Sequence, residues 1–328
     1  MKRVIFTLVI LLAGCASKSK DPVIKRIMEL EAKAEVYVSK MEALQGDFGW
    51  ISADKCDGLL FNGLAAATGR LGIDVKAAGV QGIYTRTPYA SCFPEGRSRS
   101  SISRDMLLGL AHYFWTKQDR DGIEEFIQAH EASDWIAGAH DGSLDGKSRV
   151  LVSPSLRAIF YEMRWRMGGA DSGARLIPQV FTPQKGFRIH LQVMTMHLIG
   201  RMRGKIPDGW HDLIQAYRDN NMENALFQAL ASRYGDGDQM NAVELLLSDK
   251  YFPAQRLPEH TEYCTDYLWE RDQKVPEVIE LVDEEGNKTF KITSNMVPNK
   301  DWLPCEAKEK HYQGIDWLVA YAVAMGEL

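Results

Sequence analysis

The sequence predicts a mainly α-helical fold: an array of α-helical hairpins with one small β-hairpin near the C-terminus. Apolar residues recur at the helical period through most of the chain, and glycine or asparagine interrupts that period at short intervals. No alternating strand pattern separates these helices, which disfavours an α/β fold. The clear β pattern is residues 278–294, which we interpret as two strands joined by a turn at 284–287.

Each expected element has a local signal. Asp21 and the proline after it favour a helix start, and the helical period continues to about residue 44. A second helix begins near Asp57. Residues 73–102 have no strong period and contain several glycines and prolines, so we expect a long structured loop there. Further helices are expected at 103–114, 121–132, 154–167, 188–203, 207–219, 222–234, 238–248 and 314–325. The last of these is apolar on most sides and should be buried.

Residues 1–15 have the features of an export signal. Lys2 and Arg3 precede an apolar run over residues 4–12, which is too short to be a stable membrane anchor. The run leads into Leu-Ala-Gly-Cys, ending at Cys15. This order closely resembles the bacterial lipoprotein signal, in which the cysteine is acylated and becomes the first residue of the mature chain. An ordinary secretory signal with an accidental cysteine is the alternative.

The lipoprotein resemblance implies a location. In that family an aspartate after the cysteine tends to retain the protein at the inner membrane, and this chain has Ala16 there. The resemblance therefore implies the outer membrane, with the protein facing the periplasm or the cell surface. Acyl chains such as palmitate on Cys15 bury enough hydrocarbon for stable anchoring. Residues 16–20 would be a tether, and residues 21–328 a single helical domain.

Charge and cysteine content narrow the class of protein further. The formal net charge of −5 gives no reason to expect a nucleic-acid partner. Apart from Cys15, four cysteines remain, and an even number in an exported protein suggests two disulfides. We prefer the pairs that close local loops, Cys56–Cys92 and Cys264–Cys305, each stabilising the fold by roughly 3–4 kcal/mol in the chain-entropy model. Four buried thiols are the alternative. The chain has no CxxC spacing, so we expect no zinc site, and we expect no cofactor.

Two aspartates are the candidate catalytic residues. Asp57 and Asp105 lie at the starts of the two helices that flank the 73–102 loop. Two carboxylates from different helix ends can act as general acid and general base in glycoside hydrolysis. Acids in a first helical turn also complement the helix dipole, so a structural role stays open. Arg104 could orient Asp105, and His112 shares its helix face at a spacing of seven residues.

Candidate substrate-binding residues surround these helix starts. Guanidinium groups suit carboxylates and phosphates, aromatic residues near loops can stack on sugars, and a His-Asp pair in a glycine-rich loop can supply a base or a cation ligand. Salt bridges, core packing and turn chemistry are the structural alternatives. The candidates are Arg86, Arg97, Arg99, Trp50, Trp115, His140 and Asp141.

Consecutive helical hairpins, with aspartates at helix starts and aromatic residues near the loops, look like the α/α-toroid enzymes that hydrolyse or cleave polysaccharides. The resemblance covers about residues 50–250. Roughly ten helices are expected, whereas a closed toroid has twelve, so an incomplete toroid and an irregular helical bundle both stay open.

The function expected from these features is a lipid-anchored, periplasm-facing glycoside hydrolase or polysaccharide lyase that uses a carboxylate pair. The alternative is a non-catalytic envelope lipoprotein. In that case the 73–102 loop would bind a partner protein, peptidoglycan or an anionic ligand.

Overall fold

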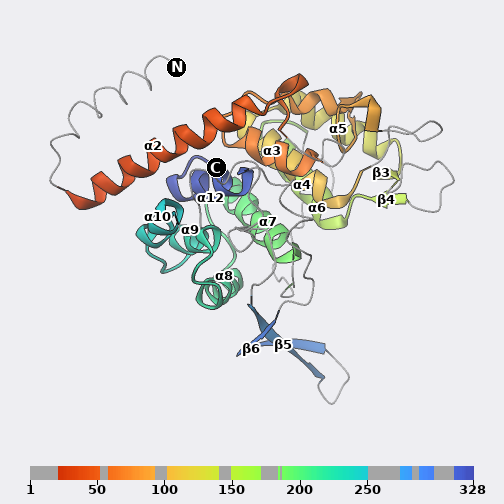
Figure 1. The fold of residues 1–328 in the computed structure, drawn as a ribbon. Helices are drawn as coiled ribbons and strands as arrows, with labels where there is room; N and C mark the ends of the chain where they lie inside the picture. The colour runs from red at the N-terminus through yellow and green to blue at the C-terminus, as the bar shows by residue number, and fades with distance from the viewer. Residues whose placement is uncertain are drawn as a thin grey trace.

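The fold is described from a computed structural model of the chain. It describes residues 21–51, 58–92, 102–139, 149–170, 184, 187–249, 274–282, 288–298 and 314–328. The predicted mainly α-helical class is confirmed (Figure 1). The α-helices are α2 (Pro22–Ala43), α3 (Leu59–Ala67), α4 (Arg104–Lys117), α5 (Arg120–Glu131), α6 (Pro154–Arg166), α7 (Phe187–Arg203), α8 (Asp208–Asn220), α9 (Ala225–Tyr234), α10 (Gln239–Leu247) and α12 (Ile315–Met325).

Three small antiparallel sheets of two strands accompany these helices in the part of the chain that the structure describes. The pair β5 (Lys274–Val282) and β6 (Lys288–Pro298) is the predicted C-terminal hairpin, and it extends away from the helices (Figure 1). The pairs β1 (Gly79–Val80) with β2 (Ile83–Tyr84) and β3 (Ile136–Ala139) with β4 (Arg149–Leu151) were not predicted. Strands of two to four residues are too short to show a period of two in the sequence.

The polar residues that begin these helices explain where several of them start. The Asp21 side chain accepts a hydrogen bond from the Val23 N–H at 2.9 Å, and Ser153 Oγ accepts one from the Leu156 N–H at 3.3 Å. Asp121, with which the sequence predicted the next helix to begin, is not its cap. The Asp119 carboxylate caps this helix, because it accepts a hydrogen bond from the Gly122 N–H at 3.0 Å, and α5 begins at Arg120.

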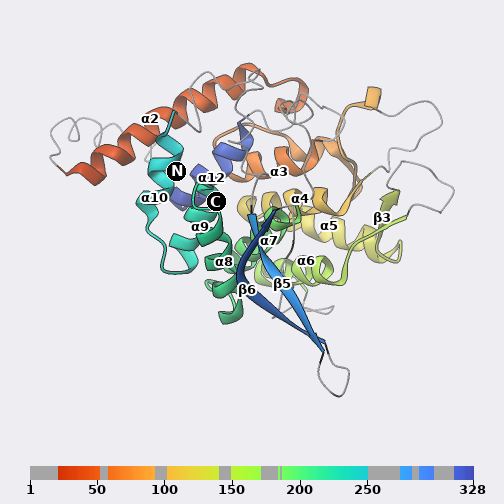
Figure 2. The same ribbon diagram turned by 60° about the horizontal axis from the view of Figure 1, so that its bottom comes forward.

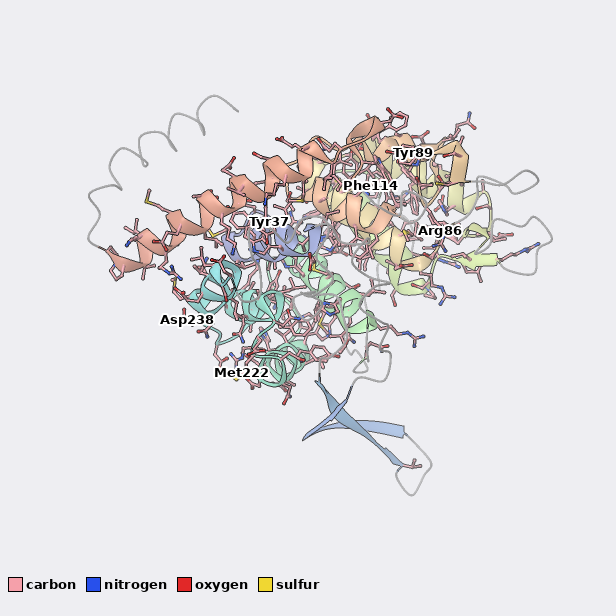
Figure 3. The ribbon with its side chains drawn as sticks, in the orientation of Figure 1. Tyr37, Arg86, Tyr89, Phe114, Met222 and Asp238 are labelled. Carbon is pink, nitrogen blue, oxygen red and sulfur yellow. The ribbon has the colours of Figure 1, made fainter. Side chains whose placement is uncertain are left out.

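Helix α12 is the central element of the core. Residues 315–324 are all buried, as their apolar composition predicted. Its Trp317 ring stacks on Tyr37 of α2 with 4.3 Å between ring centroids, and the Trp317 indole N–H donates to the Leu246 oxygen at 3.2 Å. Figure 3 shows Tyr37 on the side of α2 that faces α12. The last helix in the chain is therefore packed against the first described one.

A second close contact joins α3 to α4. The two helices cross at Gly63 and Gly109, where a Cβ built on Gly109 would lie 2.3 Å from the Leu60 oxygen and one on Gly63 would lie 2.5 Å from the Gly109 carbonyl carbon. Only residues without a Cβ allow this approach. The crossing also places the Leu60 N–H 3.3 Å from Met106 Sδ, so the first turns of α3 and α4 lie side by side.

Among the described residues, no helix combines the length and apolarity needed to cross a membrane.

Candidate functional site

The N-terminus of α4 carries the predicted pair Arg104 and Asp105. Ser103 stands at the cap position but makes no capping hydrogen bond with its side chain. Arg104 is exposed and Asp105 is half-buried in the first helical turn. An acid in this position complements the helix dipole. Asp105 also lines a pocket between α4 and two other helices.

That pocket lies where α4, α6 and α7 meet and has a volume of about 200 Å³. Charged and hydroxyl side chains share its lining with apolar ones. The lining residues are Arg104, Asp105, Leu108, Ser153, Ser155, Leu156, Ile159, Leu191 and Thr195. A volume of this size suits one small group, such as a single sugar ring or a short apolar substituent. We call it the α4 pocket.

The predicted residue Arg86 lies against the start of α3. Its backbone oxygen accepts hydrogen bonds from the Gly58 N–H at 3.2 Å and the Leu59 N–H at 2.9 Å. These N–H groups begin α3 and have no acceptor inside the helix. The loop that follows β2 is thereby fixed to the helix start. Figure 3 shows Arg86 on the side of the molecule away from the start of α2.

Asn62 fixes the chain on both sides of segment 52–57. This fully buried side chain accepts from the Ile51 N–H at 2.7 Å and donates to the Ile51 oxygen at 2.9 Å and to the Gly58 oxygen at 3.0 Å. Asp57 lies outside the described residues and directly precedes Gly58 in the chain. Gly58, the residue that follows Asp57, is therefore held by hydrogen bonds to Asn62 and to the Arg86 backbone.

The α3–α4 crossing thus brings together three segments that carry predicted site residues: the start of α3, the loop with Arg86 and the start of α4. Arg86 and the residue after Asp57 meet at the start of α3, and that start lies beside Met106 of α4. Asp105 and Met106 are neighbours in sequence and point about 100° apart on the helix. Met106 faces α3, whereas Asp105 faces the α4 pocket.

Two predicted site residues belong to the core instead. Trp50 is 1% exposed and donates its indole N–H to the Asp74 oxygen at 2.8 Å, so no ring face is open for a sugar. His112 is fully buried, and its Nε2 lies 3.0 Å from the Met194 oxygen. Burial, with the nearby Arg201 charge, lowers the pKa of His112 to about 3. Its face of α4 is covered by α7, which the helical period of α4 alone could not indicate. Trp115 is half-buried and packs partly against the core.

Cys92 is disulfide-bonded, and its partner lies outside the described residues. A disulfide at this position is what the even cysteine count predicted. The pairing with Cys56 stays a prediction. The other predicted residues outside the described ranges are Arg97, Arg99, His140, Asp141, Cys15, Cys264 and Cys305.

The sequence did not predict that α6 and α7 contribute to the pocket. A helix was predicted over 154–167, yet nothing in the sequence placed Ser153 or Thr195 beside Asp105, since these segments are far apart in the chain. In the described part of the chain, no three His, Cys, Asp or Glu side chains are arranged to hold a metal ion.

A second, shallower groove of about 490 Å³ lies at the turn between α4 and α5. Arg120 and Asp121 are among its lining residues and open α5, as Arg104 and Asp105 open α4. The same dipeptide thus occupies the same helical positions twice, which supplies a matched control for the α4 pocket.

Comparison with known proteins gives no relative: no family model, curated protein or solved structure matches this chain.

Proposed function

We propose that this chain is a lipid-anchored protein of the outer membrane that faces the periplasm and cleaves a glycan of the cell envelope. The observation that carries the proposal is the position of Asp105. Its carboxylate, in the first turn of α4, lines a pocket built from three helices. Asp121, at the equivalent position of α5, lines a more open groove at the turn between α4 and α5.

Glycan cleavage by this mechanism uses two carboxyl groups about 5–10 Å apart, one as acid and one as base or nucleophile. Asp105 is the first. Asp57 is proposed as the second because the residue after it, Gly58, is at the cap position of α3, whose first turn packs beside that of α4. In this proposal Asp105, which lines the α4 pocket beside Leu108 and Leu156, is the general acid and Asp57 is the base or nucleophile. Arg104, at the rim of the pocket, would bind an anionic substituent of the sugar.

The apolar part of the lining also supports a second candidate, a protein that binds without turnover. Leu156, Ile159 and Leu191 would hold an apolar group of an envelope ligand while Arg104 holds its charge. In this case Asp105 orients the ligand and no second carboxylate is needed.

The test is a screen of the purified protein against peptidoglycan and anionic polysaccharides. Reducing ends report hydrolysis, and absorbance of an unsaturated sugar reports a lyase. We expect Asp105→Asn and Asp57→Asn each to lower turnover by about 10²–10⁴-fold. Unchanged turnover in both variants would remove the carboxylate mechanism. Binding without turnover that is weakened by Asp105→Asn would establish the second candidate.

The lipid anchor has a separate test. Mass spectrometry of the N-terminal peptide from the membrane fraction should show acyl groups on Cys15, and Cys15→Ser should release the protein in soluble form. An unmodified cysteine would overturn the anchor and leave the pocket proposal untouched.

A further inference from the structure

We propose that the first turn of α2 is a second membrane contact, which binds an anionic phospholipid surface and sets the orientation of the protein on the bilayer. The proposal rests on the lipid anchor at Cys15 proposed above. It concerns a different part of the molecule from the α4 pocket.

An apolar surface is exposed at the start of α2. Val23 and Ile24 are each 44% exposed, and the half-buried Ile27 and Met28 follow at helical spacing on the same side. Figures 1 and 2 show the start of α2 projecting past α10 and the rest of the helices. A flat bilayer could therefore touch this end without meeting the rest of the described structure.

The short segment between the anchor and α2 would keep this surface close to the membrane. Residues 16–20 separate Cys15 from Asp21, and such a segment spans at most about 20 Å when fully extended. The start of α2 therefore lies within that distance of the acylated cysteine. A protein interface at this end would have to form in the same narrow zone, which favours the lipid surface as the partner.

The charges beside this apolar surface complement anionic headgroups. Between Cys15 and Ile27 the sequence has three lysines, Lys18, Lys20 and Lys25, and one acidic residue, Asp21. The remaining basic residue there, Arg26, is paired with acidic side chains of the protein. The Lys25 side chain is 74% exposed, with the Glu29 carboxylate 3.9 Å from its ammonium group. Apolar side chains with adjacent lysines are the combination by which interfacial helices bind membranes.

An ion pair fixes the start of α2 to the rest of the protein. Arg26 Nε donates to Glu244 Oε1 at 2.6 Å, and a second guanidinium nitrogen binds Glu244 Oε2, so α2 is held to α10 five residues after its cap. A bidentate pair of this kind fixes direction as well as distance. Because Arg86 lies on the side away from the start of α2 (Figure 3), a membrane contact there would turn the candidate site toward the periplasm.

The test uses the full mature chain with Cys15→Ser, which has no acyl chain, in co-sedimentation with vesicles. One set of vesicles contains phosphatidylethanolamine with phosphatidylglycerol, and the other contains phosphatidylcholine. We expect weak binding that favours the anionic vesicles. Adding Val23→Asp and Ile24→Asp should reduce the partition coefficient about tenfold. Val36→Asp is the matched control, since Val36 is on the same helix, is also 44% exposed and lies farther from the anchor.

No binding of Cys15→Ser to anionic vesicles, or equal binding of the Val23/Ile24 and Val36 variants, would overturn the membrane contact. Self-association that depends on Val23 and Ile24, without vesicle binding, would also overturn it and assign the surface to a second copy. If mass spectrometry finds no acyl group on Cys15 but the vesicle result holds, the anchor fails and the contact stands.

Discussion

The crossing of α3 and α4 gives the sharpest structural prediction, because it rests on two glycines and positions the candidate site. In Gly109→Ala the new Cβ would lie 2.3 Å from the Leu60 oxygen and 2.7 Å from the Leu60 Cα, both backbone atoms of a buried helix. An ordinary carbon–oxygen contact is more than 3 Å, so the helices must separate by roughly 1 Å. Neither atom is at the end of a flexible side chain, so no rotation can relieve the contact.

The expected change in stability has two parts. Overpacking of a tight core contact costs about 1–3 kcal/mol. Replacing a helical glycine by alanine stabilises the helix by about 0.8–1.0 kcal/mol through helix propensity, which offsets part of this cost. Separation of the helices also loosens the neighbouring contacts of Leu60 and Met106, which adds to the cost. We therefore expect Gly109→Ala to lower the free energy of unfolding by about 1–2 kcal/mol, measured by urea denaturation followed by circular dichroism.

Gly209→Ala is the matched control. Gly209 lies in the first turn of α8, and a Cβ there meets nothing within 4 Å. The same chemical change should leave stability unaltered or raise it by up to about 1 kcal/mol. If Gly109→Ala proved as stable as Gly209→Ala, the close crossing would be refuted, and with it the placement of the α3 start beside α4.

Three further predictions concern the surroundings of the site. Asn62→Leu removes the hydrogen bonds that hold Ile51 and Gly58, so buried backbone groups lose their partners; the free energy of unfolding should decrease by about 3–5 kcal/mol. The control is Asn220→Ala, which loses one local hydrogen bond to the Ala216 oxygen and should cost under about 1 kcal/mol. His112, whose pKa burial lowers from 6.5 to about 3, stays neutral in the folded state while the unfolded chain binds a proton. The contribution of His112 to the free energy of unfolding is therefore fully present above pH 6.5. Between pH 6.5 and about pH 3 it decreases by about 1.4 kcal/mol for each pH unit of acidification. His112→Gln should reduce this slope, measured by urea denaturation at several pH values. Peptide mapping without reductant should recover Cys92 linked to Cys56; a link to Cys264 or Cys305 would contradict the predicted pairing.

The sequence predicted the helices well because each has a local cause. The helical period, Asp21 with its bond to the Val23 N–H, and Ser153 with its bond to the Leu156 N–H are all encoded within a few residues. The buried last helix was predictable for the same reason, since it has no polar face. Elements of two to four residues, such as β1 and β3, carry no period and were missed.

The candidate site was predictable only in part. Asp105 and Arg104 could be recognised as helix-start residues, but the pocket they line needs α6 and α7, which are remote in sequence. Helical spacing placed His112 on the face of Asp105, yet α7 covers that face about two turns further along, where the imidazole is hydrogen-bonded to the Met194 oxygen. Trp50 failed as a binding residue for a similar reason: its indole N–H finds an acceptor at Asp74, which only tertiary structure supplies.

The central claim is that the Asp105 carboxylate acts on a ligand in the α4 pocket and does more than complement its helix dipole. The most direct measurement compares kcat/KM of Asp105→Asn with that of Asp121→Asn, since each aspartate follows an arginine at the second position of its helix. A loss of about 10²–10⁴-fold for Asp105→Asn, with Asp121→Asn within about twofold of the wild type, is the predicted result. Equal activity of the two variants would contradict the claim.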